Sequence, residues 1–186
     1  YSMLFTCSAL LMPILTMRML SEDMRQKTDQ VLLTAPIGLF SLLMGKFLAA
    51  LLVYVIAISI TLVYALVLSV FVSLNRAVII SSYFGILLLG AALVAVGMFI
   101  SSLTESQLVA AIVTVVVDVA LLLVDSLASL MPTTSLQNLI MGLSMADHYG
   151  SFTMGILDFA DAFFFLSIIA LFIFLTSRVL EKRRWG

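Results

Sequence analysis

The chain has 186 residues, of which 63% are hydrophobic and only 10% are charged, and its formal net charge is −1. Soluble domains carry about 25% charged residues, so this composition excludes a water-soluble domain and predicts an integral membrane protein. The near-zero net charge gives no indication of a nucleic-acid partner, and the single cysteine, Cys7, excludes an intrachain disulfide.

Five segments approach the length of about 20 apolar residues that a helix needs to cross the hydrocarbon core of a bilayer. We therefore predict an all-α membrane protein, a polytopic helical bundle, in which residues 1–186 form a single membrane domain. The last segment reaches full length if its helix begins near Asp158. In chain order, the predicted spans are Tyr1–Met17, Phe47–Asn75, Ala77–Thr104, Gln107–Met131 and Ala162–Ser177.

The basic residues predict the orientation of these spans. Eight of the nine Lys and Arg residues follow the first or the last span, and only Arg76 lies between the second and the third. The positive-inside rule places the basic-rich side in the cytoplasm. The C-terminus is then cytoplasmic and Tyr1 is external. Because no signal peptide is present to translocate such an N-terminus, we expect a further helix to precede Tyr1.

The segment 18–46, which this orientation places in the cytoplasm, begins with charged residues and becomes apolar. We expect Thr16–Met24 to continue the first spanning helix, or Ser21 to begin a second, short helix. A turn follows at Pro36, and the short amphipathic stretch Leu39–Met44 then leads back to the membrane.

Val31, Leu32 and Leu33 form an apolar side of the segment 18–46. Two interpretations differ in what this apolar side contacts. A helix that lies on lipid would have such a side. However, four basic and three acidic residues give the segment a net charge of only +1, which is weak for anionic lipid. An apolar surface framed by charges of both signs favours docking to another protein.

Two carboxylates, Asp118 and Asp125, interrupt the fourth span and lie seven residues apart on one face of a helix. A carboxylate near mid-bilayer costs about 2.5–3.5 kcal/mol and often marks a functional site, such as a proton relay or a substrate contact. The structural alternative, which we favour, is that Asp118 is hydrogen-bonded inside the bundle and that Asp125 lies in water near the outer end. The sequence lacks the GxGD motif of intramembrane aspartyl proteases.

The outer segment, residues 132–161, contains the only histidine, His148, and no Lys or Arg. Its carboxylates are Asp147, Asp158 and Asp161. One histidine with scattered carboxylates is a weak metal signal, and carboxylates also cap helices that emerge into water. We therefore predict capping and no metal site.

Two further motifs receive structural interpretations. Gly90, Gly97 and Ser101 lie on one face of the third span, where small residues let membrane helices approach closely. Gly45-Lys46 matches the end of a phosphate-binding loop, but the first glycine and the following Ser or Thr are missing. We therefore predict no catalytic residue and no bound cofactor, and any ATP hydrolysis belongs to another chain.

Three stretches together resemble a known family. The run LLMPILTMRMLSEDMRQKTDQVLLTAPIGLFSLLMGKFLAALLV resembles the ABC-2 type exporter permeases, specifically the branch related to gliding-motility and nitrous-oxide-reductase-maturation permeases. The family's hallmarks are P-x-LTMR, an acidic-basic helix, T-x-x-LLLTAP (TDQVLLTAP in this sequence) and a downstream GK. SSLTESQLVAAI resembles the family's cytoplasmic turn, and HYGSFTMGILDFADAFFFLSIIALFIFLTSRVLEKRRW resembles its outer segment, last span and basic end. The resemblance covers nearly the whole chain.

The resemblance implies a six-helix permease of the type V exporter fold, of which five spans are seen here. The family's N-terminal amphipathic helix and first span are absent from this sequence, and Asp118 occupies a position where the family tends to be apolar. Residues 18–46 would carry a coupling helix that sits in a groove of a separate ATPase. The implied ATPase-docking residues are Glu22, Arg25, Thr28, Leu32, Leu33, Thr34 and Pro36.

The same resemblance implies that the outer segment forms two short re-entrant helices at an external gate. The implied gate residues are His148, Phe152, Gly155, Asp158 and Asp161.

We therefore expect the membrane subunit of an ATP-driven ABC exporter in a bacterial inner membrane. Its expected partners are two ATPase copies that bind ATP and Mg, a second permease chain (identical or related), and an accessory extracytoplasmic subunit. One alternative is an ion-coupled secondary transporter that uses Asp118, and another is a non-transporting membrane scaffold or motor anchor. The generic apolar faces of the spans do not specify a substrate.

Overall fold

The structure is a computed structural model that describes residues 2–26, 38–71, 76–129, 142 and 144–185. Every regular element within these residues is an α-helix, which confirms the predicted all-α class. The helices are α1 (Ser2–Thr16), α2 (Ser21–Arg25), α4 (Leu39–Phe71), α5 (Arg76–Leu103), α6 (Gln107–Ser129), α8 (Met145–Thr153) and α9 (Phe159–Trp185).

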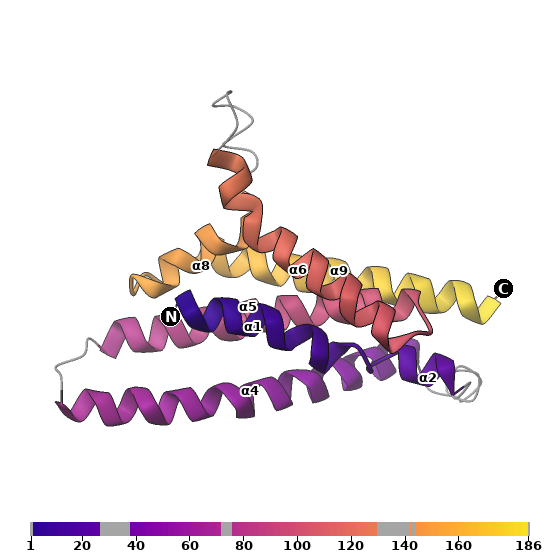
Figure 1. The fold of residues 1–186 in the computed structure, drawn as a ribbon, viewed down its shortest axis with the longest axis horizontal. Helices are drawn as coiled ribbons and strands as arrows, with labels where there is room; N and C mark the ends of the chain where they lie inside the picture. Colours follow the sequence, from indigo (N-terminus) through magenta and orange to yellow (C-terminus); the bar gives the residue numbers. More distant parts are fainter. Residues whose placement is uncertain (1, 27–37, 72–75, 130–141, 143, 186) are drawn as a thin grey trace.

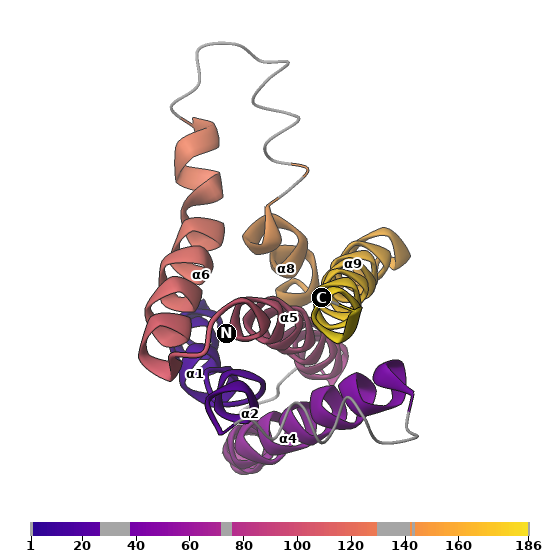
Figure 2. The same ribbon diagram turned by 90° about the vertical axis from the view of Figure 1, so that its right-hand side faces the viewer.

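Helix α5 is the centre of the bundle. Figure 2 shows it surrounded by α1, α4, α6, α8 and α9. In its most apolar part 78% of α5 is buried, whereas the corresponding share of α4 and of α9 is 22%. The outer helices instead expose large apolar side chains, such as Leu52 and Ile60 of α4. An exposed apolar face is stable in contact with lipid, so this distribution fits a membrane bundle.

Three glycines of α5 each admit a side chain from a different element. A Cβ atom at Gly90 would lie 1.8 Å from the ring of Tyr54 in α4, and one at Gly97 would lie 2.2 Å from the hydroxyl of Thr16 in α1. The third, Gly85, receives a side chain of α8 that is described below. Small residues thus permit close helix packing, as predicted for the Gly90 and Gly97 face.

Three of the predicted spans are long and apolar enough to cross a membrane within the described residues. They lie at Leu39–Val63, Ala77–Leu103 and Phe159–Arg183, so the last helix begins where the sequence predicted. Helix α6 has 23 residues, but its apolar part is the shorter stretch Gln107–Leu121. Helix α1 has 15 residues, which corresponds to about 22 Å, less than the hydrocarbon core of about 30 Å.

The structure decides between the two alternatives for the start of the segment 18–46. Thr16–Met24 is not one helix, because α1 ends at Thr16 and residues 17–20 form a turn, and a second, short helix, α2, begins at Ser21 as the other alternative predicted. The prediction that Leu39–Met44 is a separate amphipathic stretch needs correction, because it is the first part of the 33-residue helix α4.

The two ends of the bundle differ in charge. Figure 1 shows α2, the start of α4, the α5–α6 turn and the C-terminal end of α9 at one end, and α8 at the other. The end with α2 carries Arg18, Arg25 and Lys46 together with the basic C-terminal turns of α9. We call it the basic end. This arrangement agrees with the grouping from which the orientation was predicted.

Candidate functional site

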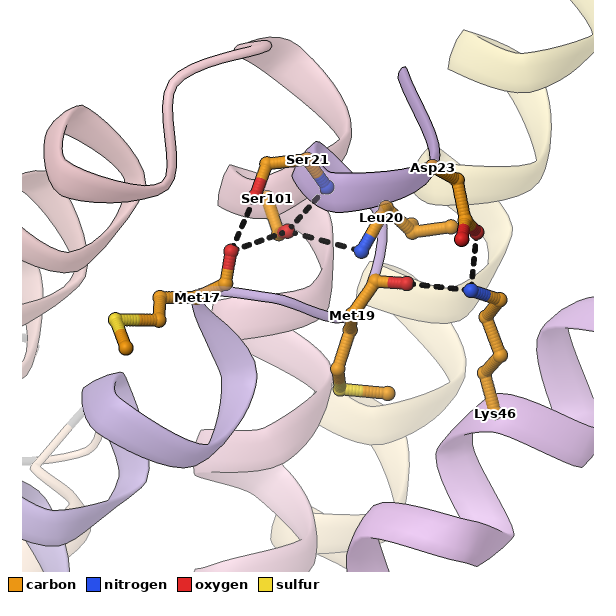
Figure 3. A network of polar contacts seen from close by, with 7 residues as sticks. All are labelled: Met17, Met19, Leu20, Ser21, Asp23, Lys46 and Ser101. Atoms are coloured by element: carbon orange, nitrogen blue, oxygen red, sulfur yellow. Dashed lines mark hydrogen bonds and ion pairs between the residues drawn. The ribbon is translucent and has the colours of Figure 1, made fainter. Parts of the chain in front are cut away.

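The basic end contains a junction at which α2 is attached to two long helices. The turn from α1 to α2 leaves backbone groups without helical partners. The buried hydroxyl of Ser101 in α5 accepts hydrogen bonds from the N–H groups of Leu20 (3.1 Å) and Ser21 (3.0 Å), and it donates one to the carbonyl of Met17 at 3.3 Å (Figure 3). One hydroxyl can make all three bonds. Ser101 therefore holds α2 against the end of α5.

Lys46 attaches the same turn to α4. Its ammonium group donates to the carbonyl of Met19 at 2.6 Å and forms an ion pair with the carboxylate of Asp23 (Figure 3). These side chains are about one quarter exposed, so the ion pair is partly shielded from water. The long Lys46 side chain also explains why a lysine does not interrupt α4. It reaches the charged surface while the helix continues past it.

Apolar contacts complete this junction. Leu20 and Met24 are buried, whereas Arg25 is exposed and Glu22 is partly exposed. Helix α2 therefore packs one side into the bundle and presents the other outward. Of the predicted docking residues, only Glu22 and Arg25 lie in the described part of the chain. Outside the described residues lie Thr28, Leu32, Leu33, Thr34 and Pro36.

Ser101 and Lys46 thus connect α2 to two separate helices, α5 and α4. Coupling between helices travels through packed side chains and hydrogen bonds. Sequence reasoning assigned Ser101 only to the small face of the third span and gave Lys46 no contact. No local signal would have joined Ser101 to residues 20 and 21, because about 80 residues separate them.

At the opposite end, His148 connects α8 to α9. Its Nδ1 lies 2.6 Å from a carboxylate oxygen of Asp161, and its Nε2 lies 3.3 Å from the carbonyl of Gly142. The ring stacks on Phe164 with a centroid distance of 4.0 Å. Within the described residues no three His, Cys, Asp or Glu side chains gather as a metal site would require. Instead, His148 and Asp161 bind each other.

Phe152 and Gly155 shape the chain between α8 and α9. The fully buried Phe152 fills the space beside Gly85 of α5. A Cβ added at Gly85 would lie 2.6 Å from the Cβ of Phe152. Gly155 has φ +86°, a conformation that glycine adopts without strain, and a Cβ added there would lie 3.0 Å from Cγ2 of Val78. Asp158 accepts a hydrogen bond from the N–H of Ala160 at 3.0 Å, which is a capping contact at the start of α9.

The gate residues predicted in the outer segment are thus arranged around α8. One short helix, α8, is described in this segment, and it packs on the N-terminal half of α5 and on α9. Residues 132–141 and 143 of the same segment lie outside the described residues, so the second predicted helix stays a prediction.

The predictions for Asp118 and Asp125 are tested to different extents. Asp118 is buried as expected, with 1% of its surface exposed, but neither carboxylate oxygen has a hydrogen-bond partner among the described residues. The predicted hydrogen bond inside the bundle is therefore not found. The backbone of Asp125 belongs to α6, and its side chain lies outside the described part of the structure.

Comparison with known proteins identifies the family. A family model described as "ABC-2 family transporter protein" matches residues 3–185, and it does not single out the gliding-motility and nitrous-oxide-reductase branch. Searches among curated proteins and among solved structures found no match. Together with its apolar helices, the match over nearly the whole chain marks a multi-pass membrane protein. The chain belongs to the ABC-2 transporter family.

Proposed function

We propose that this chain is the membrane-spanning permease subunit of an ATP-driven ABC exporter, and that residues 18–46 are the coupling loop on which a separate ATPase acts. Family membership supports a transporter membrane subunit. The observation that carries the proposal of coupling is the attachment of α2 to α5 through Ser101 and to α4 through Lys46.

In the proposed mechanism, this attachment transmits a movement of the ATPase to α4 and α5. The ATPase contacts the exposed side of α2 and the chain that follows it, with Glu22, Arg25, Thr28, Leu32, Leu33, Thr34 and Pro36 as docking residues. ATP can drive a conformational change only if the two states of the complex differ in affinity for ATP. Displacement of α2 by the ATPase would move the ends of α4 and α5 together, which changes the packing along the bundle.

The proposal includes the assembly around this chain. Two ATPase copies bind ATP and Mg, and a second permease chain, identical or related, completes the path through a bacterial inner membrane. The C-terminus lies in the cytoplasm. Residues 132–161 form the outer re-entrant segment, where an accessory extracytoplasmic subunit can dock. The resemblance of the P-x-LTMR stretch and of the C-terminal segment favours the branch of gliding-motility and nitrous-oxide-reductase-maturation permeases.

Co-purification with a paired set of variants tests the docking site. Leu32→Ala with Leu33→Ala removes two apolar anchors from the proposed interface. The loss of such an anchor can weaken binding by about 2 kcal/mol or more. We expect this double variant to recover less ATPase, and to stimulate its hydrolysis less, than wild type at equal expression.

The matched control is Leu10→Ala with Leu11→Ala, because these are also adjacent leucines and both are exposed on α1. This control should recover wild-type amounts of ATPase. Equal recovery with both double variants would contradict the docking assignment, and transport that continues without any ATPase would contradict an ATP-driven exporter.

A further inference from the structure

Asp118 differs from every other buried polar residue in the described part of the chain. It is the only one of them whose side chain has no hydrogen-bond partner there. The others all have partners, and they are Ser8, Thr16, Ser21, Ser81, Ser82, Ser101, Ser102, Thr114, Ser144, Asp161 and Thr176.

Among the described residues, no side chain forms an ion pair with Asp118. The helices packed against α6 are α1, α2, α5 and α8. His148 of α8 is paired with Asp161, Arg25 of α2 is exposed, and α1 has no charged residue. The titratable and charged groups on these helices and on α6 are Cys7, Glu22, Asp23, Arg25, Arg76, Tyr83, Asp125, Asp147, His148 and Tyr149.

The hydroxyl nearest to Asp118 along its own helix is already in use. Thr114 precedes Asp118 by four residues, on the same face of α6, and donates its proton to the carbonyl of Ala110 at 2.7 Å. An ionised carboxylate in such surroundings would lack both a counter-charge and a donor. Isolated buried charges are so costly that the group normally becomes neutral instead.

We propose that Asp118 is a proton-binding site within the membrane-spanning bundle. Its carboxyl group carries a proton in this conformation, and the proton leaves to water when movement of α6 exposes the group. The proton comes from bulk water and returns to it, so no other reactant is needed. This proposal does not depend on ATP or on an ATPase.

The position of α6 makes such exposure feasible. Its buried face consists of Ala110, Thr114 and Asp118, each separated by four residues, while Val116 and Leu123 on other faces are exposed. Figures 1 and 2 show α6 at the edge of the bundle, which it leaves toward its C-terminal end. A rotation or outward movement of this peripheral helix would bring Asp118 out of its apolar surroundings.

Infrared spectroscopy of the full chain in lipid nanodiscs tests the proposal directly. At neutral pH we expect the carbonyl stretch of a protonated carboxylic acid, shifted in heavy water and absent from Asp118→Asn. Asp147→Asn is the control, because Asp147 is an exposed carboxylate, and this variant should keep the band. A spectrum without any band that depends on Asp118 would show an ionised carboxylate and overturn the proposal.

A second measurement uses the wild-type chain and therefore does not require the variant to fold. A hydrophobic carbodiimide reacts with protonated carboxyl groups in apolar surroundings, and mass spectrometry locates the adduct. We expect several-fold more modification at Asp118 than at Asp147 at neutral pH. Equal modification of the two residues, or none at Asp118, would contradict a protonated site.

Discussion

Replacement of Ser101 by alanine tests the junction of the basic end most sharply. The substitution removes the acceptor for the N–H groups of Leu20 and Ser21, which belong to residues that are 3% and 0% exposed. Each buried donor left without a partner costs about 1–3 kcal/mol, so the attachment of α2 should weaken by about 2–6 kcal/mol. In hydrogen exchange, the free energy of opening at the amides of Leu20 and Ser21 should fall by this amount.

Ser102→Ala is the matched control, because Ser102 is the adjacent residue and is equally buried. Its hydroxyl donates to the carbonyl of Phe99 within the same helix, at 2.6 Å. Loss of that bond should cost only about 0.5–1.5 kcal/mol and leave the amides of residues 20 and 21 protected. Ser101 does not hold α2 in place if both variants reduce the protection of these amides equally, or if Ser101→Ala does not reduce this protection.

Three further predictions concern other parts of the chain. Lys46→Met should lower stability by about 1–3 kcal/mol, because the partly buried Met19 carbonyl and Asp23 carboxylate lose their donor, and it should reduce transport per ATP hydrolysed. Wild-type coupling in this variant would argue against the link to α4. Gly90→Ala should cost about 1–3 kcal/mol through overpacking and should cost less in a Tyr54→Ala background, as a double-mutant cycle of unfolding would show. A cysteine at Lys27 should resist membrane-impermeant label in intact cells and one at Ser151 should react. The reverse pattern would invert the orientation.

The helices could be predicted from the sequence because their signal is local. Uninterrupted apolar runs locate both ends of α5 and the start of α9 closely, whereas α9 continues past the predicted end at Ser177, and the small residues of α5 predict where neighbours approach it. The break after Thr16 was only one of two alternatives, because it depends on Ser101 far along the chain. The start of α4 at Leu39 was missed because Lys46 looked like the edge of the membrane, and its reach to Asp23 depends on tertiary packing.

In the outer segment and at Asp118, the sequence identified the residues but could not predict their contacts. The sequence drew attention to His148 and Asp161, but their pairing requires α8 and α9 to lie side by side. Asp118 was expected to have a hydrogen bond, since buried polar groups nearly always do. Only the arrangement of the surrounding helices could reveal that its oxygens have none in the described structure.

If the ATPase moves α2 and α5 as one unit, spin labels on these two helices should keep a fixed distance from each other. Labels replace Gln26 at the C-terminal cap of α2 and Leu103 at the end of α5, both of which are exposed and neither of which is a proposed docking residue. In the complex with the ATPase, the distance from residue 26 to residue 103 should stay the same when ATP binds. The distance from Leu103 to the same end of the second permease chain should change. If ATP changes the first distance and leaves the second unaltered, α2 moves without α5 and the proposed coupling is wrong.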